Sequence, residues 1–130
     1  MSDDLVTVPA TATVAEAAQV MSLRRVGAAL VVDGEELLGI FTERDIVRAL
    51  AAEHDAATHG VAEWMTKDPF TLDPDASAQE TLALMLAKGF RHVPVTENGR
   101  LVGVLSRSAL QRRLAEDEPP PLDEDPGTPY

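Results

Sequence analysis

Two groups of polar side chains have the types and spacing to bind a small anionic ligand. Thr42 ends an apolar run ahead of a helical pattern, and Asp45 follows it by three residues. The hydroxyl and first free amides of a helix bind anions, while one carboxylate can accept hydrogen bonds from two hydroxyl groups. Arg91 and His92 begin a distant apolar run and provide cationic donors for phosphate, with Arg44 as a weaker candidate. The combination predicts a site for a phosphorylated ligand that carries hydroxyl groups.

Both groups also have structural interpretations that require no ligand. Thr42-x-x-Asp45 is an ordinary capping box, in which two side chains satisfy free amides at a helix start. Arg91 and His92 are equally compatible with a solvated strand end on which His92 is half-buried and hydrogen-bonded. The residue types alone leave ligand binding and capping open.

A duplication places these groups on two similar halves of the chain. Gly39-Ile40-Phe41-Thr42 is echoed by Gly103-Val104-Leu105-Ser106, and the shift in numbering between these motifs (from 39 to 103) defines the repeat offset. The same offset, without a gap, aligns Met21 with Met85. A unit of roughly 60 residues is marginally stable alone, so we expect the two copies to close on each other about a pseudo-twofold axis.

The local patterns within each copy predict the element order β-α-β-β-α and an α+β fold. Thr13 and Ser77 open capping boxes ahead of helical apolar spacing, and each hairpin that follows turns at a glycine. These turn glycines lie one place out of step, which predicts hairpin loops of different shape. The expected strands cover residues 5–8, 28–32, 37–41, 70–72, 92–96 and 101–105, and the second helices cover 43–52 and 107–115.

The two copies define the expected domain organisation. Residues 5–53 form the first repeat and residues 69–116 the second, joined by a linker (54–68) with a short helix at 61–65. Residues 117–130 are acidic and rich in proline, and such a segment buries too little apolar surface to become ordered. We therefore expect an acidic, disordered tail after the second repeat.

Composition argues against several classes of function. The 130 residues contain 11 Lys and Arg against 22 Asp and Glu, a net charge of −11 that repels nucleic acid. No apolar run approaches the roughly 20 residues that cross a membrane, and the absence of cysteine excludes disulfides and cysteine-bound metal. The three histidines lack zinc spacing, and no phosphate loop or nucleophile elbow is present, which argues against a metal site and an enzyme. We expect a cytoplasmic protein with no required cofactor, no nucleic-acid partner and no membrane contact.

The motifs resemble those of a tandem pair of cystathionine-β-synthase (CBS) domains, also called a Bateman module. Gly39-Ile40-Phe41-Thr42-Glu43-Arg44-Asp45 fits the family signature Gly-apolar-x-Thr/Ser-x-x-Asp. Gly89-Phe90-Arg91-His92-Val93-Pro94-Val95 is similar to a second strand of such pairs, and Glu63-Trp64-Met65-Thr66-Lys67-Asp68-Pro69 to their inter-repeat linker. The resemblance covers about residues 5–116.

The resemblance implies a non-catalytic regulatory module that senses an adenosine-type ligand (AMP, ADP, ATP or S-adenosylmethionine) in the cleft between the repeats. It implies that Asp45 holds the ribose hydroxyls, that Thr42 lies near phosphate, and that strands of the opposite repeat frame the base and the phosphate. The expected contributions of that repeat are Phe70, Thr71 and Leu72 beside the adenine, and Arg91 and His92 beside the phosphate. Such a module is expected to form a homodimer and to signal to a separate regulated protein.

The mirror-image cleft is expected to be impaired. The repeat offset leads from Asp45 to Ala109, and from Arg91-His92 back to Gly27-Ala28. The ribose acceptor and the phosphate donors are then missing together, which predicts one competent cleft per chain. The degenerate second motif also favours an alternative function, a ligand-free CBS-fold scaffold or protein-interaction module.

Overall fold

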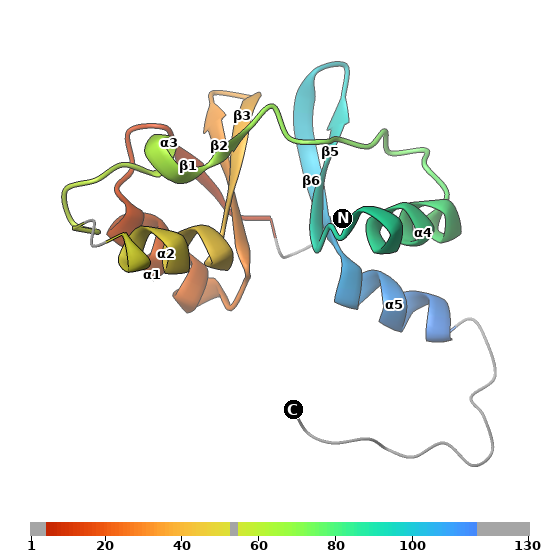
Figure 1. The fold of residues 1–130 in the computed structure, drawn as a ribbon. Coiled ribbons are helices and arrows are strands. Elements are labelled where there is room, and N and C mark those ends of the chain that lie inside the picture. Colours follow the sequence, from red (N-terminus) through yellow and green to blue (C-terminus); the bar gives the residue numbers. More distant parts are fainter. Residues whose placement is uncertain (1–4, 53–54, 117–130) are drawn as a thin grey trace, which may run out of the picture.

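A computed structural model describes residues 5–52 and 55–116, which form a mixed α+β fold with two similar halves (Figure 1). The first half contains β1 (Thr7–Pro9), α1 (Val14–Arg24), β2 (Ala28–Asp33), β3 (Glu36–Thr42) and α2 (Glu43–Ala51). The linker contains α3 (Val61–Trp64) and β4 (Thr66–Lys67), and the second half contains α4 (Ala78–Lys88), β5 (His92–Glu97), β6 (Arg100–Ser106) and α5 (Arg107–Glu116). The short linker helix predicted at 61–65 is present. The predicted disordered tail lies outside the described residues.

The two hairpins share one register, which confirms the duplication residue by residue. β2 pairs antiparallel with β3 from the pair Ala28–Thr42 onward, and β5 pairs with β6 from His92–Ser106 onward. Every pair of the second hairpin is shifted from its counterpart by the repeat offset, and the same β-bulge recurs in both. The strand order β1-β2-β3-β6-β5 joins the hairpins into one sheet, although a single residue pair links β3 to β6.

The two hairpin turns have the same length but different backbone conformations, as the displaced glycines predicted. In the first turn Gly34 has a positive φ of 62°. In the second, Asn98 (53°) and Gly99 (82°) both have positive φ, the pattern of a type I′ turn. The turns differ because only the second sequence supplies two adjacent residues that tolerate the left-handed region.

The expected edge strand at residues 70–72 is reduced to one bridge in the structure. Leu72 pairs in parallel with Val95, at the position equivalent to the pairing of β1 with β2 in the first half. Pro69 and Pro74 flank the segment, and proline cannot donate a hydrogen bond to a longer ladder. The first repeat therefore has the predicted β-α-β-β-α order, whereas the second lacks a full first strand.

The linker contributes a strand that the sequence did not predict. β4 pairs antiparallel with β3, with Lys67 opposite Gly39 and Thr66 opposite Ile40. A Cβ atom on Gly39 would lie 2.7 Å from the Thr66 carbonyl oxygen and 2.7 Å from the Met65 sulfur. The glycine is therefore needed at this position because the linker backbone approaches β3 too closely for a side chain.

The helices α1 and α4 are capped at equivalent positions in the two halves, but the residue type at the C-terminal position differs. Thr13 caps α1 with both bonds of the predicted capping box, whereas Ser77 caps α4 only by accepting from the Glu80 amide at 3.3 Å. At the C-terminal ends, Arg25 and Gly89 both adopt the left-handed conformation, with φ of 57° and 76°. The repeat offset relates these two positions, so an arginine occupies a site where its counterpart is glycine.

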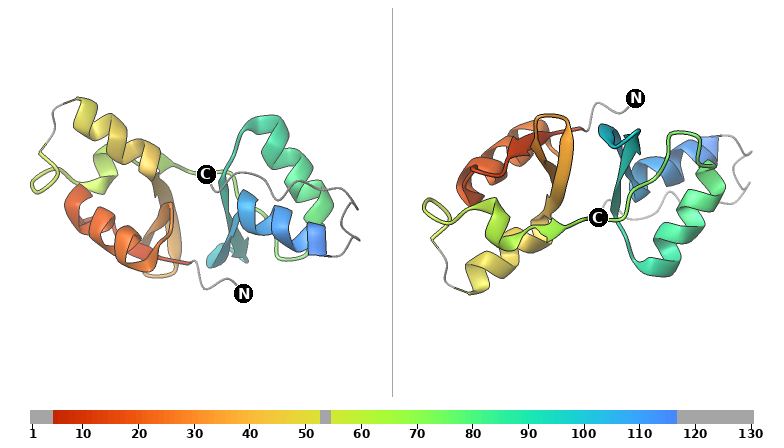
Figure 2. Two further views of the ribbon diagram at one scale, coloured as in Figure 1. Left: turned by 90° about the horizontal axis from the view of Figure 1, so that it is seen from below. Right: turned by 90° about the horizontal axis from the view of Figure 1, so that it is seen from above.

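Three apolar clusters hold the fold together, one inside each half and one between them. The first core packs β1, α1, β2, β3 and α3 around Phe41, and the second packs α4, β5 and α5 around Met85. The third cluster joins Leu30 and Ile40 of the first hairpin to Val104 of the second. The helices of each half lie on the outer side of its hairpin, away from the other half (Figure 2). No helix within residues 5–52 and 55–116 is long and apolar enough to cross a bilayer.

Candidate functional site

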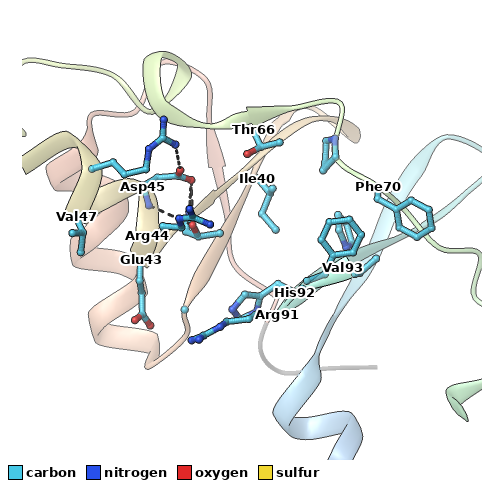
Figure 3. A pocket seen from close by; sticks show the side chains of 17 residues that line it. Ile40, Glu43, Arg44, Asp45, Val47, Thr66, Phe70, Arg91, His92 and Val93 are labelled. Carbon is cyan, nitrogen blue, oxygen red and sulfur yellow. Dashed lines mark hydrogen bonds and ion pairs between the residues drawn. The ribbon is translucent and has the colours of Figure 1, made fainter. Parts of the chain in front are cut away.

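A cleft of about 760 Å³ lies between the two halves (Figure 3). One wall comes from the end of β3 and the start of α2, and the other from the segment before α4 and the start of β5. Six of the eight residues predicted for ligand binding line this cleft. They are Thr42, Arg44, Asp45, Phe70, Arg91 and His92.

Thr42 and Asp45 form a complete capping box at the start of α2. The Asp45 Oδ2 atom accepts hydrogen bonds from the Thr42 amide (2.9 Å) and the Thr42 hydroxyl (3.2 Å), and the Asp45 amide donates to Thr42 Oγ1 at 3.4 Å. Asp45 is only 4% exposed, yet it belongs to the cleft wall. The capping interpretation is therefore confirmed. It does not exclude a ligand, because a carboxylate has about four acceptor positions.

The second oxygen of Asp45 faces Arg48 on the next turn of α2. Arg48 Nη1 donates to Asp45 Oδ1 at 3.2 Å, and the Arg48 guanidinium carbon lies 5.5 Å from the centre of the Trp64 ring. The Arg48 side chain is 56% exposed, so its pairing with Asp45 is partly screened by water. Sequence reasoning did not single out Arg48 as a cation beside the Asp45 carboxylate. Its spacing of three residues from Asp45 on a helix was a usable signal.

Polar side chains from the two halves meet at Gly27. A Cβ atom on Gly27 would lie 2.9 Å from Glu43 Oε1 and 3.1 Å from His92 Nε2. Figure 3 shows Arg91 and His92 reaching from the second half towards the first, near Glu43. Glu43, which was not predicted as a site residue, places a carboxylate in the part of the cleft that carries the predicted phosphate donors.

The remaining wall of the cleft is apolar and comes from both halves. Ile40 and Val47 belong to the first half, while Phe70, Phe90 and Val93 belong to the second. The rings of Phe70 and Phe90 stack with centroids 5.7 Å apart and an angle of 25° between their planes. Phe70 is 43% exposed, so this aromatic pair offers a partly open surface to a flat apolar group.

Thr71 and Leu72, the other two residues predicted for ligand binding, do not line the cleft. Leu72 packs with the core around Met85 and binds the backbone of β5, donating to the Pro94 carbonyl at 3.0 Å. Thr71 is exposed and lies outside the cleft wall. Pro69 and Phe70 are the residues of this segment that line the cleft, because the segment then turns to bridge β5 at Val95 and carries Leu72 into the core.

A second, smaller hollow of about 210 Å³ lies at the mirror-image position. It contains Gly27 and Ala28 opposite Ser106, as the repeat offset predicted. The expectation that it lacks cationic donors is wrong, because Arg25 and Arg112 also line it.

Potential metal ligands do not cluster in the described part of the chain. Within residues 5–52 and 55–116, no three His, Asp or Glu side chains gather in a way that could hold a metal ion. On the linker, His59 Nδ1 pairs with Glu63 Oε2 at 2.8 Å.

Comparison with known proteins assigns both halves to one kind of domain. The family model of the CBS domain matches residues 1–52 and 61–116. The CBS domain-containing protein CBSCBSPB1 of Arabidopsis thaliana is 42% identical over 101 residues, which cover 76% of this chain and 19% of the relative. The chain spans less than two thirds of the length of the first curated relatives that it matches.

Solved structures with this fold include two whose names state a bound adenosine compound. A CBS domain protein from Pyrobaculum aerophilum, complexed with AMP, is 29% identical, has a TM-score of 0.78, and aligns over 89% of this chain and 95% of its own. The CBS domain pair of protein MJ0100, in complex with 5′-methylthioadenosine and S-adenosyl-L-methionine, is 27% identical with a TM-score of 0.78. The coverage there is 88% of this chain and 93% of the other.

Proposed function

Because the chain belongs to the CBS-domain family, with two such domains side by side, we propose that it is a non-catalytic module that senses an adenosine-type ligand. The ligand binds in the large cleft between the two repeats, which are related by a pseudo-twofold axis. AMP, ADP, ATP and S-adenosylmethionine are the candidates, in keeping with the compounds bound by the two solved relatives.

The observation that carries this proposal is that the two walls of the cleft come from different repeats. The hydroxyl-binding carboxylate of Asp45 belongs to the first repeat, while the cationic side chains of Arg91 and His92 belong to the second. Folding stability alone does not require complementary polar groups on opposite repeats, whereas a nucleotide does, because its ribose and phosphate need different partners.

The chemistry of the walls gives the ligand one orientation. The adenine packs on the aromatic pair Phe70 and Phe90, opposite Ile40, and the ribose hydroxyls reach Asp45 Oδ1 beside Arg48. Oδ1 accepts a single hydrogen bond among the described contacts, so it retains an acceptor position. The phosphate then extends towards Arg91, where the Thr42 end of α2 adds the positive end of a helix dipole.

The charges on the cleft wall limit how many phosphates the cleft favours. Arg44, Arg48 and Arg91 give three positive charges, and Glu43 and Asp45 give two negative ones. The net charge of the wall is therefore about +1, with His92 neutral, which is less than a triphosphate would demand. On this basis AMP is expected to bind at least as tightly as ATP.

One observation favours the alternative, a ligand-free scaffold or protein-interaction module. Both oxygens of Asp45 already accept hydrogen bonds inside the protein, from Thr42 and from Arg48. In this alternative the carboxylate serves only to cap α2, and no adenosine compound stabilises the folded state.

Thermal unfolding with a panel of adenosine and guanosine nucleotides and S-adenosylmethionine separates the two functions. A ligand at about 100 times its Kd adds roughly 2.7 kcal/mol to the free energy of unfolding, which raises the Tm by several degrees. The sensing proposal expects such a shift for at least one adenosine compound and none for the matching guanosine compound. If no compound moves the Tm, the scaffold function replaces it.

Asp45→Ala and Glu16→Ala form a matched pair for locating the ligand. Each variant removes the acidic member of a capping box in the first repeat, at a cost of about 1 kcal/mol, but only Asp45 lies in the cleft. We expect Asp45→Ala to weaken binding more than tenfold by calorimetry and Glu16→Ala to leave affinity unchanged. Equal affinities for both variants would remove Asp45 from the site.

Signalling to a partner requires that binding alter the arrangement of the repeats. Since the two walls come from different repeats, a ligand that prefers one inter-repeat angle shifts the population towards it. We propose that a homodimer transmits this change to a regulated protein, using exposed apolar side chains on the outer helices. The most exposed outside the large cleft are Leu23 on α1, Leu50 on α2 and Leu86 on α4.

Two measurements test the signalling part separately. Light scattering should give a dimer for the wild type and a monomer for the double variant Leu23→Glu/Leu50→Glu, with the Tm reported for both. Small-angle scattering and amide exchange should change when the ligand binds. A monomeric wild type contradicts the dimer, and unchanged scattering and exchange contradict the change of angle.

A further inference from the structure

The smaller hollow, called the small cleft from here on, is lined by side chains whose charge is opposite in sign to the net charge of the protein. The chain carries a net charge of −11, yet the residues that line this hollow include two arginines and no aspartate or glutamate. Two hydroxyl groups and one imidazole complete its polar lining. The polar side chains are Arg25, His92, Ser106, Ser108 and Arg112.

We propose that the small cleft binds a free inorganic oxyanion, with phosphate or pyrophosphate as the chemical class. Guanidinium groups are the side chains best suited to phosphate, because their planar N–H groups match its oxygens. Serine hydroxyls supply further donors. The lining residues include no carboxylate, and the Glu43 carboxylate lies beside Gly27, at the boundary with the large cleft.

The Ser106 hydroxyl can donate to an anion because the second repeat has no counterpart of the Asp45 carboxylate. In the large cleft, the Thr42 hydroxyl donates its hydrogen to Asp45. In the small cleft the corresponding residue is Ala109, whose amide donates to Ser106 Oγ at 3.2 Å and whose side chain accepts nothing. Within the described chain, the hydroxyl hydrogen of Ser106 therefore remains available for an anion.

Arg25 occupies a backbone position that favours glycine. Its φ of 57° lies in the left-handed region, where the second repeat has Gly89. A non-glycine residue in this conformation is destabilising, and such residues recur at functional sites. The unfavourable conformation fits a requirement for a cationic side chain in the hollow, which glycine could not supply.

The size of the hollow favours a small oxyanion over a nucleotide. Pockets that bury drug-sized molecules measure about 300–1,000 Å³, a range that includes the large cleft but not the 210 Å³ of the small one. At roughly 30 Å³ per water molecule, the small cleft holds about seven waters. This space suits one or two phosphate groups without a nucleoside.

Titration of the full chain with inorganic phosphate and pyrophosphate, at constant ionic strength, tests the proposal. Amide NMR signals of Ser106 and Ser108 should shift and saturate. Arg112→Gln should weaken binding about tenfold or more, the loss expected for a charge-assisted hydrogen bond. Arg113→Gln is the matched control, since it removes the same charge from the next residue of α5 outside both clefts, and we expect a change below twofold.

Three outcomes would overturn the proposal. The first is the absence of any saturating shift, and the second is an equal loss in Arg112→Gln and Arg113→Gln, which indicates diffuse charge attraction. The third is a requirement for nucleotide, in which Arg112→Gln weakens ATP binding while inorganic phosphate alone does not bind. That result would assign Arg112 to the terminal phosphates of a ligand in the large cleft.

The same titration on Asp45→Ala keeps this proposal separate from adenosine sensing. Asp45 does not line the small cleft, so phosphate binding should persist in that variant. If nucleotides fail to bind the wild type but phosphate still binds, the sensing function fails and the oxyanion site stands. The reverse result would retain the sensing function alone.

Discussion

The two clefts arise from hairpins of identical register, yet they differ in volume, in the charges of their lining residues and in the strand that runs beside them. The large cleft measures about 760 Å³ and has Asp45 at the start of α2, whereas the small one measures about 210 Å³ and has Ala109 at the equivalent place of α5. Strand β4 runs beside the large cleft and contributes Thr66 to its wall. Gly27 and His92 line both hollows, so the clefts share a boundary.

This difference shows that a duplication preserves backbone geometry more strictly than chemistry. Hydrogen-bond register and the bulge are retained because every residue of a hairpin depends on them. Side chains at the cleft rims carry no such constraint, and in our proposals one rim binds a sugar and phosphate together while the other binds an anion alone. Predictions that exchange or disturb these rims test the comparison.

The largest effect is expected from Gly39→Ala, which disturbs only the large cleft. The new Cβ atom would approach the Thr66 carbonyl oxygen within 2.7 Å, so β4 must move away from β3. Crowding of this kind costs about 1–3 kcal/mol of stability, and it displaces Thr66 from the cleft wall. Thermal unfolding should show a clear loss of Tm together with weaker adenosine binding.

Gly60→Ala is the control for that prediction. Its Cβ atom would meet its nearest neighbour at 3.6 Å, an ordinary contact, and Gly60 lies outside both clefts. A Tm loss in Gly60→Ala as large as in Gly39→Ala would show that β4 packing is not the cause.

The next effect is expected from Ala109→Asp, which gives the small cleft the carboxylate of the large one. The new side chain would accept the Ser106 hydroxyl and oppose an anion, so phosphate affinity should fall more than tenfold, or about 1.4 kcal/mol. Stability should rise slightly because the helix gains a capping box. Calorimetry with phosphate checks the first effect and thermal unfolding the second, and an unchanged phosphate Kd would contradict the proposed site.

Sequence reasoning was most successful where repeated local patterns carry the structure. The repeat offset anticipated both hairpins, and the spacing of Thr42 and Asp45 anticipated the capping box, whereas its place in a cleft was implied by the resemblance to CBS pairs. The hairpins and the capping box both depend on hydrogen bonds between residues that are close in sequence or paired within one hairpin. Such features can be read from a single chain.

Apart from Arg48, which a local spacing could have indicated, β4 and the arginines of the small cleft were missed because they depend on contacts between distant segments. β4 forms because the linker backbone lies against Gly39, and no local pattern in Thr66–Lys67 indicates a strand. Arg25 and Arg112 belong to different repeats and enter the same hollow only after the two repeats pack together. The prediction of a cleft without cations failed because it compared only residues related by the repeat offset.

A smaller effect is expected from Glu43→Gln, which removes one of the two carboxylates of the large cleft. Loss of a negative charge near the phosphate donors should strengthen ATP binding about threefold, or roughly 0.6 kcal/mol. S-adenosylmethionine carries a positive sulfonium and should bind more weakly in the same variant. Calorimetry with both ligands checks the opposite signs, and Glu16→Gln, on α1 outside both clefts, should alter neither. A change of the same sign for both ligands would place Glu43 away from the charged part of the ligand.

The last comparison exchanges the residues that follow α1 and α4, and its effects on stability are also about 1 kcal/mol or less. Arg25→Gly relieves a left-handed backbone at φ 57° and should stabilise the protein by about 0.5–1 kcal/mol, since glycine adopts this region freely. Gly89→Ala imposes the reverse change at φ 76° and should cost about 1 kcal/mol. Chemical denaturation measures both values, and phosphate titration of Arg25→Gly should show weaker binding despite the higher stability. A variant that is more stable but binds phosphate more weakly would identify Arg25 as a residue retained for its side chain. A more stable variant with unchanged phosphate affinity would leave Arg112 as the arginine on which the small cleft depends.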